Sequence, residues 1–225
     1  TVDCSVTEHE KIAALAESGI DVIVTDHHEP GVGALPGGLA VVNPKRTDQD
    51  YPFRELTGVG VGFKLAWAVC ETVMGSPRVG KRLQEALLGL LPLVALGTIA
   101  DVAPLVDENR VLVAHGLQAF RRADPGLAAL AEVSGVDLGR LTVRDVAFGL
   151  APRLNAAGRL GHADAALHLL LEDDPPRATE LARDLDRQNR ERQKLCQETR
   201  EEALALVRDV FDPARDAAIV VAADR

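Results

Sequence analysis

Apolar and polar positions in the first 45 residues alternate in a way that predicts a parallel sheet. Residues 7–19 repeat apolar side chains at helical spacing and end at Gly19, which indicates an amphipathic helix. Short runs rich in β-branched residues at 20–25 and 39–42 indicate buried strands, and residues 1–4 read as the end of an earlier strand. Strand, helix and strand in this order form a parallel crossover unit. We therefore predict an α/β fold with a parallel sheet flanked by helices.

The pattern after residue 56 is helical and leads to a long polar helix. Gly-rich residues 133–140 separate two groups of expected helices. Residues 176–209 carry few apolar side chains among many charges, which is typical of a helix that connects two domains. We expect a first domain over 1–175, this connector helix over 176–209, and the start of a second domain over 210–225. Helices are expected at 56–74, 79–89, 91–100, 108–122, 142–150 and 162–171.

Composition limits the kinds of partner. The chain of 225 residues is 47% hydrophobic, enough for a sizeable core, and carries 34 acidic against 25 basic residues. This acidic balance, with one Trp, one Tyr and five Phe, argues against a surface that grips nucleic acid along its length, so any such contact must be local. Three cysteines without close spacing argue against a zinc knuckle or a disulfide scaffold, and we expect a reduced, cytoplasmic setting. No uninterrupted apolar run reaches about 18 residues, so we expect no membrane contact.

Both ends of the chain look truncated. The chain lacks an initiator Met, residues 1–4 read like the tail of a strand, and residues 217–223 read like a strand that begins a new unit. We therefore expect this sequence to be a fragment of a longer protein.

Acidic and imidazole side chains follow the predicted strands. Asp26, His27 and His28 come directly after the strand at 20–25, and Asp3 ends the preceding one. Because the carboxyl ends of parallel strands line one crevice, these four side chains should meet there. Carboxylate and imidazole without thiolate suit manganese, iron or magnesium better than structural zinc. The alternative, a turn capped by Asp26 with two solvated histidines, is weakened by the nearby Asp3.

Two further features are ambiguous on their own. Asp101 ends the apolar run 93–100, where it suits a helix cap and a metal ligand equally well. Arg153, Asn155 and Arg159 stand in a stretch of small residues that we expect to be a loop, and two arginines with an amide can clasp a phosphate. Taken alone, this stretch is better explained as an ordinary surface loop.

Taken together, these motifs resemble the DHH phosphoesterase superfamily. Asp-His-His after a strand, preceded by the strand-terminal Asp3, carries that likeness. Over essentially the whole chain, the ordered motifs are similar to the RecJ family within it, bacterial exonucleases that degrade single-stranded DNA from the 5′ end. The matching segments are 24–30 (VTDHHEP), 42–46 (VNPKR), 51–53 (YPF), 58–61 (GVGV), 97–102 (GTIADV) and 153–159 (RLNAAGR).

The resemblance implies a metal-dependent phosphodiesterase that acts in DNA repair and recombination. It implies two Mn²⁺ ions, with Mg²⁺ as the alternative, and a bound water that attacks the phosphodiester. It also implies single-stranded DNA as the substrate, with single-strand-binding protein and a helicase as candidate partners. In the family pattern Asp3 bridges the ions, His27 and Asp101 each bind one, Asp26 orients His27, His28 faces the scissile phosphate, and Arg153, Asn155 and Arg159 hold phosphate oxygens.

The sequence departs from the family pattern in places and leaves two alternatives open. Ser5 stands where the family commonly has Gly, and no Asp-x-Asp precedes Asp3, although the family carries this motif on an earlier strand. The chain also stops before the glycine-rich motif of the family's second domain. A phosphodiesterase for short oligonucleotides or cyclic dinucleotides would share this site, and a catalytically silent scaffold that binds replication partners would share the fold. The intact acidic and histidine residues speak against the scaffold.

Overall fold

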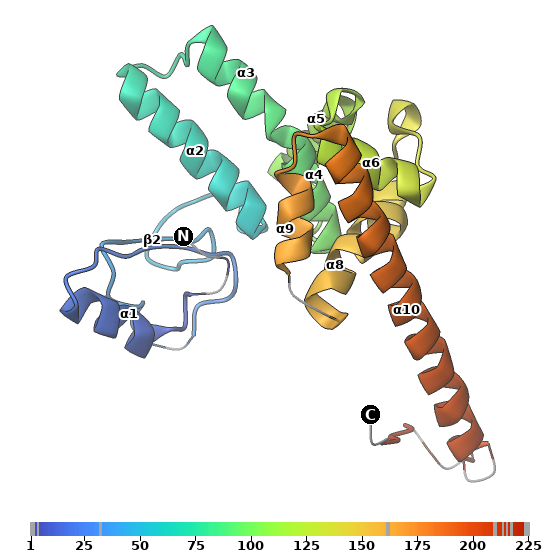
Figure 1. The fold of residues 1–225 in the computed structure, drawn as a ribbon. Helices are drawn as coiled ribbons and strands as arrows, with labels where there is room; N and C mark the ends of the chain where they lie inside the picture. Colours follow the sequence, from blue (N-terminus) through green and yellow to red (C-terminus); the bar gives the residue numbers. More distant parts are fainter. Residues whose placement is uncertain are drawn as a thin grey trace.

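An N-terminal lobe that holds the sheet lies apart from a larger helical part, and helix α2 (Gly58–Met74) leads from one to the other (Figure 1). The long helix α10 (Pro175–Val207) runs past the helical part and extends away from it. The computed structural model describes residues 3, 5–31, 33–160, 163–208, 211, 212, 214, 216 and 218–222.

The order of elements confirms the predicted fold class, a parallel sheet with helices, followed by a helical part and a long helix. The elements are α1 (His9–Glu17), β1 (Ile23–Thr25), β2 (Ala40–Val42), α2 (Gly58–Met74), α3 (Lys81–Gly89), α4 (Leu91–Ala100), α5 (Asp107–Ala119), η1 (Phe120–Arg122), α6 (Pro125–Ser134), η2 (Leu138–Arg140), α7 (Val143–Asp145), η3 (Val146–Leu150), α8 (Ala151–Leu160), α9 (Asp164–Leu170) and α10 (Pro175–Val207). Of these, η1 and η2 are 3₁₀ turns and η3 is a π-helical turn.

The sheet is small and parallel. Within the described residues it consists of β1 and β2, with Val24 opposite Val41. Helix α1 packs on it through Ile12, which forms a small core with these two valines. The strand expected at 1–4 falls on residues of which only Asp3 is described, and Asp3 lies in a turn.

The main hydrophobic core lies in the helical part. Its buried side chains come from α4, α5, η1, α6, η3, α8, α9 and α10 and include Phe120, Leu130 and Leu150. Removal of these side chains from water is the main source of stability for such a bundle. Gly126 allows α6 to lie against α9, because a Cβ atom at this position would be only 1.9 Å from the carbonyl oxygen of Leu169.

Two stretches differ from the prediction. Helix α6 forms where no element was expected; Pro125 begins it, and Gly135, at φ 67°, ends it. Residues 153–159, expected to form a loop, lie in α8, which continues α7 and η3 as one helical stretch over 143–160. The small side chains that suggested a loop are helix contacts, since Ala157 is buried in the core.

Helix α10 has two different halves. In the first half Ala182, Leu185 and Asn189 are buried against α6, α8 and α9. Beyond Asn189 none of the described residues of this helix is buried, and this half projects from the helical part (Figure 1). The expected connector thus begins inside the helical core and leaves it only after residue 189.

One helical stretch in the described part of the chain, Lys81–Ala100, is long and apolar enough to cross a membrane by length and composition alone. It is not an uninterrupted apolar run, because its first part contains charged residues such as Lys81 and Glu85. A core helix passes the same test, and α4, the second half of this stretch, buries Val94, Leu96 and Ile99 in the protein. The core therefore accounts for the apolar character of α4.

Candidate functional site

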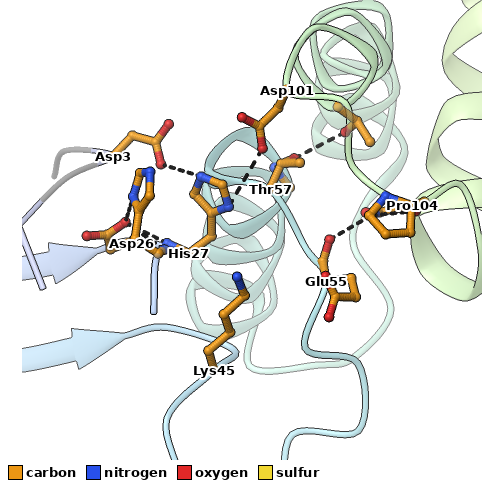
Figure 2. Close-up of polar contacts among 12 residues, drawn as sticks. Asp3, Asp26, His27, Lys45, Glu55, Thr57, Asp101 and Pro104 are labelled. Carbon is orange, nitrogen blue, oxygen red and sulfur yellow. Dashed lines mark hydrogen bonds and ion pairs between the residues drawn. The ribbon is translucent and has the colours of Figure 1, made fainter. Parts of the chain in front are cut away.

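The His27 ring lies between two carboxylates that are far apart in the sequence. Its Nε2 is 3.4 Å from Oδ1 of Asp3, and its Nδ1 is 3.8 Å from Oδ2 of Asp101. Figure 2 shows the ring between the two acidic side chains. His27 follows β1 and Asp101 follows α4, so the site joins the sheet lobe to the helical part. The structure thus brings together the three residues expected to bind metal.

Asp26 is fully buried directly after β1 and organises the loop that carries both histidines. Its Oδ1 accepts hydrogen bonds from the backbone N–H groups of His27 and His28, at 2.7 and 3.1 Å. Its Oδ2 accepts a hydrogen bond of 2.9 Å from the N–H of Val6. Burial raises the pKa of this carboxyl, but the hydrogen bonds from Val6 and the histidines outweigh burial and hold the pKa below its ordinary value. Asp26 is therefore ionised at neutral pH.

The ring that Asp26 holds belongs to His28. Oδ1 of Asp26 is 2.7 Å from Nδ1 of His28, whereas His27 meets Asp26 through its backbone N–H. The expectation that Asp26 orients the His27 ring does not hold, because the chain turns the other imidazole back onto the carboxylate. With Nδ1 engaged, Nε2 is the nitrogen of His28 that can face a ligand.

Asp101 is positioned by an unusual helix end. The N–H of Val102 donates to the carbonyl of Ile99 at 3.1 Å, and the N–H of Ala103 donates to that of Thr98 at 3.4 Å, which is the Schellman pattern. The residue after the cap is usually Gly, but here it is Val102, at φ 57°. This conformation is costly for a β-branched residue, and such strain clusters at functional sites. Asp101 is thus the cap residue of α4 as well as a neighbour of the imidazole.

The start of α2 forms another wall of the site. Thr57 caps the helix by accepting from the N–H of Gly60 at 3.4 Å, and its hydroxyl is 3.2 Å from that of Thr98 in α4. The next residue, Gly58, lies against Asp3, because a Cβ atom on Gly58 would be 2.0 Å from Oδ1 of Asp3. In its observed orientation, the Asp3 side chain therefore fits only beside a glycine.

Asn155 and Arg159 face the same hollow as Asp3 and Asp101. This hollow has a volume of about 570 Å³, and its other walls come from the start of α2 and the end of α4. Asn155 and Arg159 are four residues apart on α8, which places them on one face of the helix. An amide and a guanidinium thus line the same hollow as two carboxylates, an arrangement that suits a phosphate group bound beside cations.

Arg153 lies outside this hollow. Its Nε and Nη2 atoms are 2.9 and 2.8 Å from Oδ1 of Asp186 in α10, and its Nη1 donates to the carbonyl of Gly149 at 2.6 Å. A separation of two residues is about 200° around a helix, so Arg153 and Asn155 point to different sides of α8. The expectation that Arg153 lies beside Asn155 and Arg159 is therefore not met, and this side chain instead joins α8 to α10.

The loop after β2 supports the histidines and was not singled out for this role by the sequence. Buried Asn43 donates from Nδ2 to the carbonyl of His28 at 2.9 Å and accepts at Oδ1 from the N–H of Lys45 at 2.8 Å. The Lys45 side chain extends toward the region of His27 (Figure 2), and its Nζ is 3.4 Å from Glu29. The segment 42–46 was noted only as part of the family likeness, although an Asn-Pro after a strand is a turn signal.

The donor atoms of this site fit a divalent cation. One carboxylate oxygen of Asp3 and one ring nitrogen each of His27 and His28 lie within 4.8 Å of one another. Asp101 adds a second carboxylate on the other side of the His27 ring. Oxygen and imidazole donors without thiolate are the ligands that suit Mn²⁺ and related ions. These residues could therefore hold a metal, with His28 as an additional candidate ligand.

The sequence matches known families and proteins. Residues 1–98 match the model of the DHH family, N-terminal domain. The chain is 45% identical over 208 residues to the single-stranded-DNA-specific exonuclease RecJ of Bacillus subtilis, covering 92% of this chain and 25% of that protein. It is 41% identical over 210 residues to the protein of the same name from Escherichia coli, covering 92% of this chain and 36% of that protein. The chain thus spans between a quarter and about a third of the length of these curated relatives.

The fold matches solved structures. A crystal structure of exonuclease RecJ bound to manganese superposes with a TM-score of 0.78 at 43% identity, over 92% of this chain and 50% of that one. The Mn²⁺ complex of RecJ from Thermus thermophilus gives a TM-score of 0.77 at 43% identity, over 95% of this chain and 30% of that one. Both similarities extend well past residue 98 and include the helical part.

Proposed function

Because the chain belongs to the DHH family, we propose that it carries the metal-binding half of an exonuclease that degrades single-stranded DNA from the 5′ end. The observation that carries this proposal is the hollow in which Asp3 and Asp101 face Asn155 and Arg159. This hollow therefore contains both ligands for cations and donors for phosphate oxygens. The names of the relatives, which are single-stranded-DNA-specific exonucleases, support the same substrate.

Asp3, His27 and Asp101 would hold divalent metal, Mn²⁺ by preference and Mg²⁺ as the alternative. Ions bound there would polarise phosphate oxygens and lower the pKa of a bound water. RecJ has been crystallised with Mn²⁺ and with Mg²⁺, which supports either ion. The glycine at position 58 supports the assignment of Asp3, because any larger residue would push that carboxylate away.

The remaining residues act on the substrate. Arg159 and Asn155 would bind phosphate oxygens and fix the phosphodiester in the hollow. Asp26 holds Nδ1 of His28, so that Nε2 of this ring would face the reacting phosphate. Asn43 restrains the same loop through the carbonyl of His28. Each of these groups binds or orients; none has to form a covalent bond.

The domain organisation expected from the sequence remains part of this proposal: a DHH domain over residues up to 175, α10 as the connector, and the start of a second domain over 210–225. The break in packing after Asn189, rather than at residue 176, marks where the connector leaves the first domain. A nuclease of this kind needs an unpaired strand, which makes a helicase and single-strand-binding protein its expected partners in the cytoplasm.

The test is a nuclease assay on the longest natural polypeptide that contains this chain. Oligonucleotides labelled at the 5′ or the 3′ end are supplied single-stranded or annealed, with Mn²⁺ or with EDTA. Release of 5′-labelled mononucleotides from the single strand, in Mn²⁺ only, is expected. A length series separates the alternative, because an enzyme for short oligonucleotides or cyclic dinucleotides would lose activity as the strand lengthens. No cleavage of any substrate would indicate a silent scaffold.

A further inference from the structure

Phe148 is exposed to an unusual degree for an aromatic residue. Its side chain is 74% exposed, whereas Phe53, Phe63 and Phe120 are buried. The guanidinium carbon of Arg144 lies 5.4 Å from the centre of the Phe148 ring, within the range of a cation–π contact. In a chain with one Trp, one Tyr and five Phe, this is the most exposed aromatic ring among the described residues.

Phe148 lies on the same helix face as the proposed phosphate-binding residues. Over 143–160, α7, η3 and α8 form one helical stretch whose inner face buries Val146, Leu150 and Ala157. In α8, positions two residues away from Ala157 point to the opposite side, since each step turns an α-helix by about 100°. In the π-helical turn, Phe148 is exposed between the buried Val146 and Leu150 and so lies on the outer side. Phe148, Asn155 and Arg159 occupy such positions, and all three are exposed.

The distance along this face suits a strand that leaves the site. Phe148 and Arg159 are 11 residues apart, which corresponds to about 16 Å at about 1.5 Å per residue. Phe148 also lies in the π-helical turn η3, a rare conformation that occurs frequently at functional sites. A base beyond the nucleotide held in the hollow would therefore meet this ring rather than the phosphate-binding residues.

We propose that Phe148, with Arg144 on its ring, is a stacking platform for a base of the single strand whose end is held at Asn155 and Arg159. This inference rests on the proposed function and specifies how the substrate is held outside the hollow. Stacking on an aromatic ring accepts every base, as a nuclease without sequence preference requires. A basic side chain beside the ring also suits a polyanion, and an acidic protein must provide such contacts locally.

The charges around Phe148 favour a nucleic acid over a protein partner. Arg140 and Arg144 lie on either side of the cap residue Thr142. The neighbouring carboxylate of Asp145 accepts from the N–H and the hydroxyl of Thr142, at 2.9 and 2.7 Å, and so serves the helix cap. A protein interface would need a broad apolar patch, whereas here a single ring stands beside cationic groups.

The test combines a protein variant with an altered strand. Binding of an oligothymidylate of about ten nucleotides is measured by fluorescence anisotropy in EDTA, with wild type, Phe148→Ala and Phe148→Trp in the full-length polypeptide. We expect about tenfold weaker binding for the Ala variant and near wild-type binding for the Trp variant. Val73→Ala on α2 is the control, because Val73 is also 74% exposed and lies on another helix.

Abasic nucleotides then locate the stacked base. With wild type, removal of one particular base should weaken binding about tenfold; with Phe148→Ala the same removal should have no further effect. Equal DNA binding by wild type and Phe148→Ala would overturn the proposal that Phe148 is a stacking platform. The same holds if removal of that base weakens binding by the variant as much as it weakens binding by wild type. The proposal would also be overturned if Phe148→Ala bound DNA as wild type does but had a different sedimentation coefficient, because this face would then be a contact between protein chains.

The same samples separate the two proposals. If wild type cleaves the oligonucleotide in Mn²⁺ and Phe148→Ala binds it equally well, the platform fails and the proposed function stands. If wild type neither binds nor cleaves the strand, the proposed function fails, and the platform fails with it.

Discussion

The buried carboxylate of Asp26 lies 2.7 Å from Nδ1 of His28 and, through the same oxygen, accepts the backbone N–H groups of both histidines. A single side chain thus sets the path of the loop and the orientation of one ring. Because an ionised carboxylate only accepts hydrogen bonds, Nδ1 of His28 must carry the proton. Nε2 is then the ring nitrogen that is free to meet a ligand.

Asp26→Asn tests this relationship. An amide presents one accepting oxygen and one donating NH2 group. The NH2 group would face either the N–H of Val6 or the three N–H groups of His27 and His28 that now donate to Oδ1. We expect nuclease activity to fall about tenfold or more, together with a loss of thermal stability, measured by initial rates and by melting of the metal-free protein. Asp21→Asn, at an exposed position just before β1, should change neither quantity. Wild-type activity in Asp26→Asn would show that the ring needs no such support.

The two histidines should differ in their effect on metal binding. His27 lies between Asp3 and Asp101, so His27→Ala removes a ligand, and even outer partners of a ligand typically change metal affinity about 10- to 100-fold. His28→Ala should leave Mn²⁺ affinity nearly unchanged and lower turnover, because this ring acts on the phosphate. Calorimetric titration with Mn²⁺ and steady-state rates on both variants distinguish the roles. Equal losses of affinity would make His28 a ligand as well, as its proximity to Asp3 and His27 allows.

Two glycines in α2 provide a matched pair. A Cβ atom on Gly58 would be 2.0 Å from Oδ1 of Asp3, whereas one on Gly62 would meet nothing within 4 Å. Gly58→Ala should therefore displace Asp3 and weaken Mn²⁺ binding measured by calorimetry. Gly62→Ala should leave Mn²⁺ binding intact and raise the free energy of unfolding by up to about 1 kcal/mol, because alanine favours the helix. Wild-type Mn²⁺ affinity in Gly58→Ala would remove Asp3 from the ligand set.

The sequence predicted that the acidic and histidine side chains lie close together, because the end of a strand can be recognised from a few neighbouring residues. The carboxyl ends of parallel strands meet at one edge of the sheet. A β-branched run followed by Asp26, His27 and His28 places these residues at the carboxyl end of a strand without knowledge of the rest of the fold. The role of Asp101 was harder to predict, since an Asp after an apolar run suits a helix cap and a metal ligand alike. In the structure it caps α4 and also lies beside the His27 ring.

The sequence could not predict the direction of individual side chains in α8. Small residues next to arginines resemble a loop, but here Ala157 packs in the core and the stretch is helical. Helical periodicity then separates Arg153 from Asn155 and Arg159, and the choice of partner for Arg153 depends on Asp186 in a distant helix. A contact of this kind between distant helices cannot be read from the local sequence and overrides the structure that the local sequence favours.

The two arginines of α8 should therefore respond oppositely to truncation. Arg159→Ala should lower the rate at least about tenfold, or about 1.4 kcal/mol in activation free energy, with an unchanged melting temperature. Arg153→Ala should cost about 1–3 kcal/mol of stability, because it removes the contacts to Asp186 and to the carbonyl of Gly149, although Asp186 keeps its ion pair with Arg190. Rates and chemical denaturation on both variants give the comparison. A stability loss in Arg159→Ala with normal turnover would reverse the assignment.

Val102 offers a test of the strained helix end beside Asp101. At φ 57° a β-branched residue costs about 1–2 kcal/mol relative to an ordinary conformation, while glycine adopts this region freely. Val102→Gly relieves that strain, and because Val102 is 87% exposed, little apolar contact is lost. The gain is offset by the greater freedom of glycine in the unfolded chain, about 0.5–1 kcal/mol. We expect the free energy of unfolding to stay level or to rise by up to about 1 kcal/mol.

Val106, four residues further along the same loop, is the control for this substitution. It is also exposed, but its φ of −120° is an ordinary extended conformation, so Val106→Gly relieves no strain and should only destabilise the protein. Chemical denaturation of the two variants measures the contrast directly. Nuclease activity supplies the second readout: if the strain serves to hold Asp101 near His27, Val102→Gly should lower the rate while stability is maintained. A variant that is both as stable and as active as wild type would show that the hydrogen bonds of the helix end are sufficient to place Asp101.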